Sequence, residues 1–156
     1  METEALFTWE TWMWGTSLAI FVLLCVSAFF SGSETALTAA NRAKLHGAAE
    51  RGSRGASGAL TLKEDSERLI GSILLGNNLA NILATSLATS LFTAMLGEGG
   101  VAAATLVMTA LVLIFAEVLP KTYAIIKPEG MAAFVSMPIA IVVRLLAPVV
   151  NVVRGI

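Results

Sequence analysis

Oxygen-bearing polar side chains interrupt three long apolar segments of this sequence. Hydroxyl, amide and carboxylate oxygens are the ligands that a hard cation such as Mg²⁺ binds in proteins. These groups are expensive in the hydrocarbon of a membrane, and a carboxylate there marks a functional site by default. The sequence has a single cysteine and a single histidine, so it offers no ligand set for a soft metal. The pattern therefore indicates a cation site built from oxygen ligands, in clusters at residues 30–35, 76–81 and 116–121.

Ser31, Asn77 and Glu117 are the residues of the three clusters that we expect at one depth. A helix rises about 1.5 Å per residue, which puts each of them roughly 12–15 Å from the cytoplasmic end of its segment. The hydrocarbon core of a bilayer is about 30 Å thick, so this depth is close to its middle. Three spans are thus predicted to place oxygen ligands at the same level of the membrane.

Two residues are predicted to break the helices beside these ligands. Pro120 has no N–H to donate to the carbonyl of Ala116, which adjoins Glu117. Gly32 weakens the first helix between Ser31 and Ser33 and lets backbone approach closely. Carbonyl groups freed at membrane depth are tolerated where they line a wet cavity, and transporters use them to coordinate ions. Gly32 and Pro120 are therefore the expected helix-break positions.

Polar residues also recur every four positions, which places them on one face of each helix. Small hydroxyl residues commonly line helix–helix contacts in membranes, so packing is an equally good reading of the outer threonines. Packing explains the asparagines and the glutamate much less well. The repeats are Ser27, Ser31 and Thr35 in the first segment, Asn77, Asn81, Thr85, Thr89 and Thr93 in the second, and Thr105, Thr109 and Glu117 in the third.

Glu34 lies three residues after Ser31 and shares its helix face. It is either a further ligand or the ion-pair partner of Lys121 or Arg42. Lys121 has an alternative of its own, because a long basic side chain can snorkel to the cytoplasm. Glu34 could thus supply a second charge, and Ser27, Thr35 and Thr85 add spare oxygens that a second, weaker cation such as Na⁺ could share.

Composition places the chain among integral membrane proteins. Of its 156 residues, 56% are hydrophobic and 13% charged, and the mean hydropathy is +0.81. Soluble domains carry roughly 25% charged residues. The net charge of −1, with no basic patch, argues against a nucleic-acid partner.

We also expect that the protein is not an enzyme. Ser31 as a nucleophile would need a general base, and the single histidine, His46, lies in a basic loop.

The distribution of basic residues predicts the orientation. Residues 42–68 contain six Lys/Arg, whereas residues 1–14 and 97–100 contain none. Since cytoplasmic loops carry the excess of positive charge, the N-terminus is expected outside and the 42–68 loop in the cytoplasm.

The Gly/Ser-rich stretch 52–58 is typical of a mobile linker, and residues 97–100 are typical of a tight turn. The predicted spans are about 16–41, 69–95 and 101–126.

The last segment, residues 129–154, is apolar but interrupted by Pro138 and Arg144. It is either a fourth, kinked span or a juxtamembrane helix along the cytoplasmic interface, and the interruptions favour the interface. The predicted fold is therefore all-α and integral to the membrane, as one domain over residues 1–156 with three transmembrane helices and a juxtamembrane helix.

At these residues the chain resembles the transmembrane domain of the CorC/CNNM family. The resemblance covers nearly the whole chain and lies in three motifs. They are Ser31-Gly32-Ser33-Glu34-Thr35-Ala36-Leu37, Leu75-Gly76-Asn77-Asn78-Leu79-Ala80-Asn81 and Glu117-Val118-Leu119-Pro120-Lys121.

The resemblance implies a homodimeric Mg²⁺ exporter coupled to Na⁺ in the inner or plasma membrane. It also implies cytoplasmic CBS-pair modules in a full-length chain, and this sequence contains none. A membrane-anchored dimer that regulates divalent-cation homeostasis without transport is the alternative. The family's ion site maps most directly onto Ser31, Asn77 and Glu117. With the neighbouring groups, the expected metal ligands are Ser31, Gly32, Ser33, Asn77, Asn81, Ala116 and Glu117.

Overall fold

The computed structural model describes residues 1–155, and every regular element within that range is helical. This confirms the all-α prediction. In chain order the elements are α1 (Glu2–Ala39), α2 (Arg42–Glu50), α3 (Arg54–Glu64), α4 (Ser66–Leu96), the 3₁₀ turn η1 (Gly97–Gly99), α5 (Gly100–Leu111), the π-helix η2 (Val112–Val118), α6 (Leu119–Ile126) and α7 (Pro128–Arg154).

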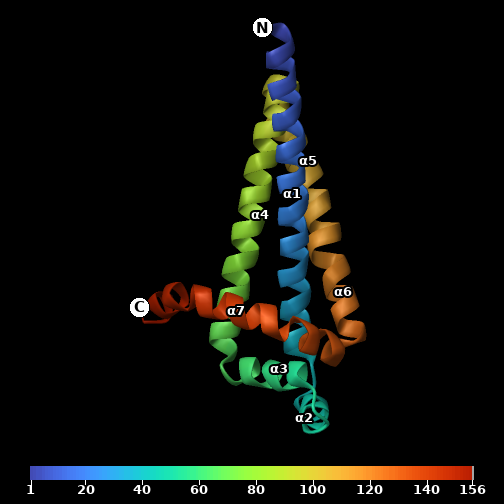
Figure 1. The fold of residues 1–156 in the computed structure, drawn as a ribbon, viewed down its shortest axis with the longest axis vertical. Helices are drawn as coiled ribbons and strands as arrows, with labels where there is room; N and C mark the ends of the chain where they lie inside the picture. Colours follow the sequence, from blue (N-terminus) through green and yellow to red (C-terminus); the bar gives the residue numbers. More distant parts are fainter. Residues whose placement is uncertain (156) are drawn as a thin grey trace.

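Within residues 1–155, three helical stretches are long and apolar enough to cross a membrane: Glu2–Ala39, Ser66–Ile126 and Pro128–Arg154. The middle stretch is a hairpin, because the chain reverses at Gly97, whose φ of 67° suits glycine. It contributes two antiparallel rods, α4 and the continuous α5–η2–α6, which stand beside α1 (Figure 1). The predicted turn at residues 97–100 is confirmed.

Helix α7 lies across the ends of the three rods that are opposite to the N-terminus (Figure 1). Its buried residues Val135 and Ile139 belong to a core shared with Leu37 of α1 and Ile73 of α4. Pro138 and Pro148 lie inside this helix without ending it. The predicted helix over residues 129–154 is therefore present, and it runs crosswise to the other three.

The prediction of a mobile linker within residues 42–68 is wrong, because this segment folds into α2 and α3. The residues that suggested a linker act as helix ends. Ser53 caps α3 by accepting a hydrogen bond from the Ala56 N–H at 3.1 Å, and Gly52 adopts a φ of 94° in the turn before it. Gly55 then lets α3 approach α7, because a Cβ there would lie 2.5 Å from the Ala133 carbonyl oxygen.

Lys63 of α3 closes the C-terminal end of α1. Its Nζ donates to the carbonyl oxygens of Leu37 at 2.6 Å and Ala40 at 3.1 Å. A cation at a helix C-terminus satisfies orphan carbonyls and interacts favourably with the helix dipole. Burial, together with the nearby charge of Arg42, lowers the pKa of Lys63 from its ordinary value.

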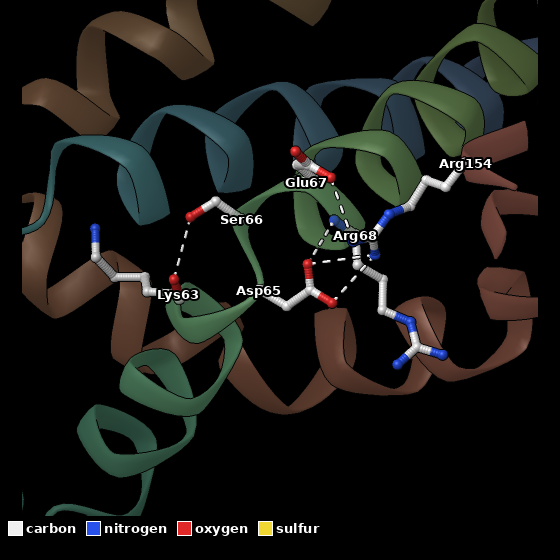
Figure 2. A network of polar contacts seen from close by, with 6 residues as sticks. All are labelled: Lys63, Asp65, Ser66, Glu67, Arg68 and Arg154. Atoms are coloured by element: carbon white, nitrogen blue, oxygen red, sulfur yellow. Dashed lines mark hydrogen bonds and ion pairs between the residues drawn. The ribbon is translucent and has the colours of Figure 1, made fainter.

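The far end of α7 is joined to the start of α4 by charged side chains (Figure 2). The Arg154 guanidinium lies 3.2 Å from Asp65 Oδ2 and 3.2 Å from Glu67 Oε2. Asp65 also caps α4, because its Oδ1 accepts from the Arg68 backbone N–H at 3.2 Å. The two ends of α7 are thus anchored, one by the chain connection to α6 and the other by Arg154.

Candidate functional site

The site begins where α1 and α4 pack against each other. Ser27 is fully buried, and its hydroxyl donates to Asn77 Oδ1 at 2.7 Å. The helices approach closely because the face of α4 beyond Asn77 is built from small residues, with Ala80 and Ala84 buried. This hydrogen bond orients the Asn77 amide within the helix contact.

Two oxygen atoms next to this contact are buried without a hydrogen-bond partner among residues 1–155. They are Ser31 Oγ, one helical turn along α1 from Ser27, and Asn81 Oδ1, one turn along α4 from Asn77. A buried polar atom left unpaired costs about 1–3 kcal/mol, so each one requires an explanation. Oxygens of this kind are positioned to bind a cation or a water.

The depth of Ser31 differs from the expectation. The hydrogen bond joins Asn77 to Ser27, and α1 and α4 run in opposite directions. Ser31 therefore lies about one turn, roughly 5 Å, from Asn77 toward the C-terminal end of α1. Asn81 lies about one turn away in the other direction. The side-chain oxygens of Ser31, Ser27, Asn77 and Asn81 therefore follow one another along the helix contact instead of forming a single ring. We call these four residues the oxygen ladder.

The rod formed by α5, η2 and α6, which we call the third rod, changes its helical geometry around Glu117. Residues 112–118 form the π-helix η2, which contains Ala116 and Glu117. Leu119 donates to the Ile114 carbonyl, five residues earlier, and the next residue, Pro120, has no N–H to donate. Short π-segments inside α-helices are frequent at functional sites. The turn before Pro120 thus departs from α-helical geometry by widening, while the freed Ala116 carbonyl stays a prediction.

A groove of about 350 Å³ connects α4 with the third rod. Asn81 and Thr85 line it from α4, and Glu117 lines it from η2. Thr105 and Thr109 add hydroxyl groups from α5, which confirms that they share a face with Glu117. The arrangement brings a carboxylate, an amide and several hydroxyl groups into one space.

The expected helix break at Gly32 is wrong, because α1 continues through it to Ala39. The expected close approach at Gly32 is confirmed, because Gly32 is a point of close packing between α1, α6 and α7. A Cβ there would lie 2.6 Å from Met131 Cε and 3.4 Å from Pro120 Cβ. Its neighbour Ser33 is buried, and its hydroxyl donates to the Phe29 carbonyl at 2.6 Å within the same helix. The Ser33 hydroxyl is therefore bonded within its own helix, and the assignment of Gly32 and Ser33 as ligands stays a prediction.

A second groove, of about 330 Å³, lies between α1 and α6. Glu34, Thr35 and Lys121 line it. Neither expected ion pair of Glu34 is formed within 4.0 Å in the part of the chain that the structure describes. Arg42 instead donates to the Lys63 carbonyl at 3.2 Å. Thr35 consequently belongs to this groove and not to that of Glu117.

The outer threonines of α4 do not extend the ladder. The Thr89 hydroxyl donates to the Thr85 carbonyl at 2.8 Å within its own helix, and Thr93 is exposed.

One buried oxygen was missed by the sequence analysis, namely Ser72 Oγ, which has no partner among residues 1–155. Ser72 lies five residues before Asn77 and so falls outside the four-residue repeat that drew attention to the others.

The donor set is made of oxygen atoms and carries little charge. Residues 1–155 contain no group of three or more His, Cys, Asp or Glu side chains that could hold a metal ion. The available ligands around the ladder are hydroxyl and amide oxygens, one carboxylate at Glu117, and backbone carbonyls. Such a set matches a hard cation that is bound weakly enough to be released.

Comparisons with known proteins agree with the membrane placement of these helices. Residues 18–156 match the cyclin M (CNNM) transmembrane N-terminal domain. The chain is 41% identical over 131 residues to the UPF0053 inner membrane protein YfjD of Escherichia coli, covering 84% of this chain and 31% of that protein. It is 37% identical over 137 residues to a UPF0053 protein of Haemophilus influenzae, covering 86% and 33%.

A chloroplastic DUF21 domain-containing protein of Arabidopsis thaliana is 39% identical over 136 residues, which cover 87% of this chain and 21% of that protein. The chain thus spans about a third or less of the length of these relatives. The match to the domain covers nearly the whole chain, and the helices suit a multi-pass membrane protein. The chain therefore belongs to the family of the cyclin M transmembrane N-terminal domain.

Proposed function

We propose that this domain transports Mg²⁺ across the membrane, with Na⁺ as the coupling ion. The observation that carries the proposal is the pair of buried, unpartnered oxygens, Ser31 Oγ and Asn81 Oδ1, on either side of the Ser27–Asn77 contact. A folded helix pair that buries such atoms beside a carboxylate groove is better explained by a cation ligand than by packing.

The ligand chemistry supports Mg²⁺ as the transported ion. Mg²⁺ takes oxygen ligands at about 2.0–2.1 Å in octahedral geometry and usually keeps several waters. In this proposal Ser31, Asn77 and Asn81 offer neutral oxygens, the Ala116 carbonyl adds backbone oxygen, and Glu117 supplies the charge. One carboxylate leaves half of the ion's charge uncompensated. Binding is then weak enough for release on the other side.

The coupling to Na⁺ rests on the oxygens beside the Mg²⁺ ligands. The Thr85 hydroxyl lies in the groove of Glu117, and Thr35 and Glu34 lie in the second groove. Ser27 contributes a further hydroxyl, although it is already bonded to Asn77. Na⁺ accepts hydroxyl and carbonyl oxygens as ligands, so it can bind to the oxygens that Mg²⁺ does not use. If both ions depend on Glu117, each should weaken the binding of the other by the same factor.

The proposed orientation rests on charge and on the two faces of α7. The basic residues of α2 and α3 favour a cytoplasmic position for these helices, with the N-terminus outside the cell membrane. One face of α7 packs on α3 through residues such as Ala133. Another face of α7 exposes an apolar stripe, which suits a juxtamembrane helix in the cytoplasmic interface. The stripe contains Phe134, Met137, Ile141 and Leu145.

A homodimer would explain why polar side chains of the groove are exposed on a single chain. Thr85, Thr105 and Thr109 are exposed, and Glu117 is half-buried. Facing lipid, these groups would be costly, and polar residues within membranes usually face protein or a water-filled cavity. A second copy over this side of α4 and α5 would shield them while leaving a wet passage.

Purified protein in liposomes tests the proposal directly. We expect Mg²⁺ efflux that follows an opposing Na⁺ gradient at fixed membrane potential. Glu117→Gln keeps the size of the side chain and removes its charge, so it should abolish or strongly reduce both Mg²⁺ binding by calorimetry and flux. Gln substitution at the exposed Glu10 is the matched control and should leave both unchanged.

Three results would contradict parts of this proposal. Unchanged affinity in Glu117→Gln would remove that carboxylate from the site. Efflux that ignores the Na⁺ gradient would indicate a channel or uniporter. Mg²⁺ binding without any flux from the wild-type domain would favour the alternative function, a dimeric membrane regulator of divalent-cation homeostasis.

A further inference from the structure

The second groove holds two opposite charges close to the proposed Mg²⁺ site. Glu34 comes three residues after Ser31 on α1, and Lys121 comes four residues after Glu117 on the third rod. The close contact of Gly32 with Pro120 holds these two rods together at this point. Both charged side chains consequently line one cavity of about 330 Å³.

The two charges are near each other but are not paired. Glu34 and Lys121 are both half-buried, and no ion pair joins them within 4.0 Å in residues 1–155. The nearest basic residue in sequence after α1, Arg42, is held by the Lys63 carbonyl. Lys121 is therefore the cation that the groove itself offers, and its long side chain can move within the cavity.

The position of Lys121 has an electrostatic consequence for an ion at Glu117. Without an ion, Glu34, Glu117 and Lys121 together carry one negative charge. With Mg²⁺ bound they carry one positive charge. Charges in a partly buried site are screened much less than charges in water. The Lys121 ammonium therefore repels a Mg²⁺ ion bound at Glu117, four residues earlier on the same rod.

We infer that Lys121 is a tethered cation that lowers the affinity of the site for Mg²⁺ and so permits its release. This inference rests on the proposed Mg²⁺ transport. In the ion-free state the ammonium compensates the carboxylates of Glu34 and Glu117. When Mg²⁺ enters, the ammonium moves away from the ion within the groove, which Thr38 also lines. Lys121 sets the affinity without itself contacting the ion.

The test compares dissociation constants for Mg²⁺, measured by calorimetry on the purified domain. Lys121→Gln should bind Mg²⁺ about tenfold more tightly, because a repulsive charge is removed. Release should become slower, so Mg²⁺ flux in liposomes should fall. Lys121→Arg keeps the charge and should retain the wild-type affinity. Lys127→Gln removes an exposed lysine close to the end of the same rod and is the matched control.

Glu34→Gln provides a second, independent variant and should weaken Mg²⁺ binding. Without the Glu34 carboxylate, the positive charge of Lys121 is less compensated and repels Mg²⁺ more strongly. Wild-type or weaker affinity in folded Lys121→Gln would overturn the inference and leave Lys121 as a snorkelling side chain. Unchanged affinity in Glu34→Gln would also count against it. Failure of the proposed transport is distinguishable, since it would show as an absence of Mg²⁺ flux from the wild-type domain, whereas the inference is tested by the Mg²⁺ affinity of Lys121→Gln relative to that of the wild type.

Discussion

Two adjacent amides show how the site depends on single residues. Asn77 and Asn78 are identical side chains about 100° apart around the axis of α4. Asn77 is half-buried and accepts a hydrogen bond from Ser27, whereas Asn78 is exposed. The same side chain thus lies in the helix contact at one residue and is exposed at the next.

This difference gives a paired prediction. Asn77→Ala should weaken Mg²⁺ binding by about ten- to a hundredfold, the usual worth of a hydrogen-bonding or ligand group next to a charge. Asn78→Ala should leave the affinity unchanged. Calorimetry on both variants measures the effect. A larger loss in Asn78→Ala would show that the face of α4 assigned to the site is the wrong one.

At the scale of elements, the π-helix η2 is the feature that positions the carboxylate. A π-turn adds one residue to the helix and rotates the later turns relative to those of an uninterrupted α-helix. Here it ends at Val118, just before Pro120, whose ring lies close to Gly32 of α1. The element therefore couples the direction of Glu117 to the packing of α6 on α1.

Pro120→Ala tests this role of the element. Alanine restores the missing donor, and a helix interior gains up to about 3 kcal/mol when proline is removed. We expect the thermal stability of the domain to rise or stay constant while Mg²⁺ flux falls, because an α-helical turn would redirect Glu117. Wild-type flux in this variant would show that the π-segment is not needed for transport.

At the scale of the whole molecule, Arg154 connects the C-terminal end of α7 to the beginning of α4. It bridges Asp65 and Glu67 at 3.2 Å each, and these two residues begin the helix that carries Asn77. The backbone N–H of Arg68 is the main cause that lowers the pKa of Asp65 from its ordinary 3.8, and the Arg154 side chain lowers it further. Burial acts in the opposite direction.

The sign of this shift predicts a pH dependence. A carboxyl whose pKa is lowered by folding stabilises the folded state above its ordinary pKa. That contribution is lost as the pH falls through the lowered value. The melting temperature of the wild type should therefore exceed that of Asp65→Asn at neutral pH, and the difference should shrink below the ordinary pKa of 3.8.

Thermal unfolding of both proteins between neutral pH and about pH 3 measures this difference. Arg154→Gln should reduce it at neutral pH, because one of the causes of the shift is removed. A difference that grows on acidification would contradict the assignment of Asp65 as a stabilising anion.

The sequence by itself determined what depends on neighbouring residues. Apolar runs predicted the rods, the four-residue repeats predicted which faces carry Asn81 and Thr109, and Pro120 predicted a disturbance beside Glu117. Glycines at residues 97–100 predicted the reversal of the chain. Each of these results from helical periodicity or from backbone chemistry that acts within a few positions.

Only the tertiary structure decided which residues meet across helices. It paired Asn77 with Ser27 and not with Ser31, and it turned Gly32 from an expected break into a contact with α6 and α7. It also folded the expected linker into α2 and α3 beneath a crosswise α7. The physical reason is that helix register and close approach depend on side chains from segments far apart in the chain, whose contacts no local pattern specifies.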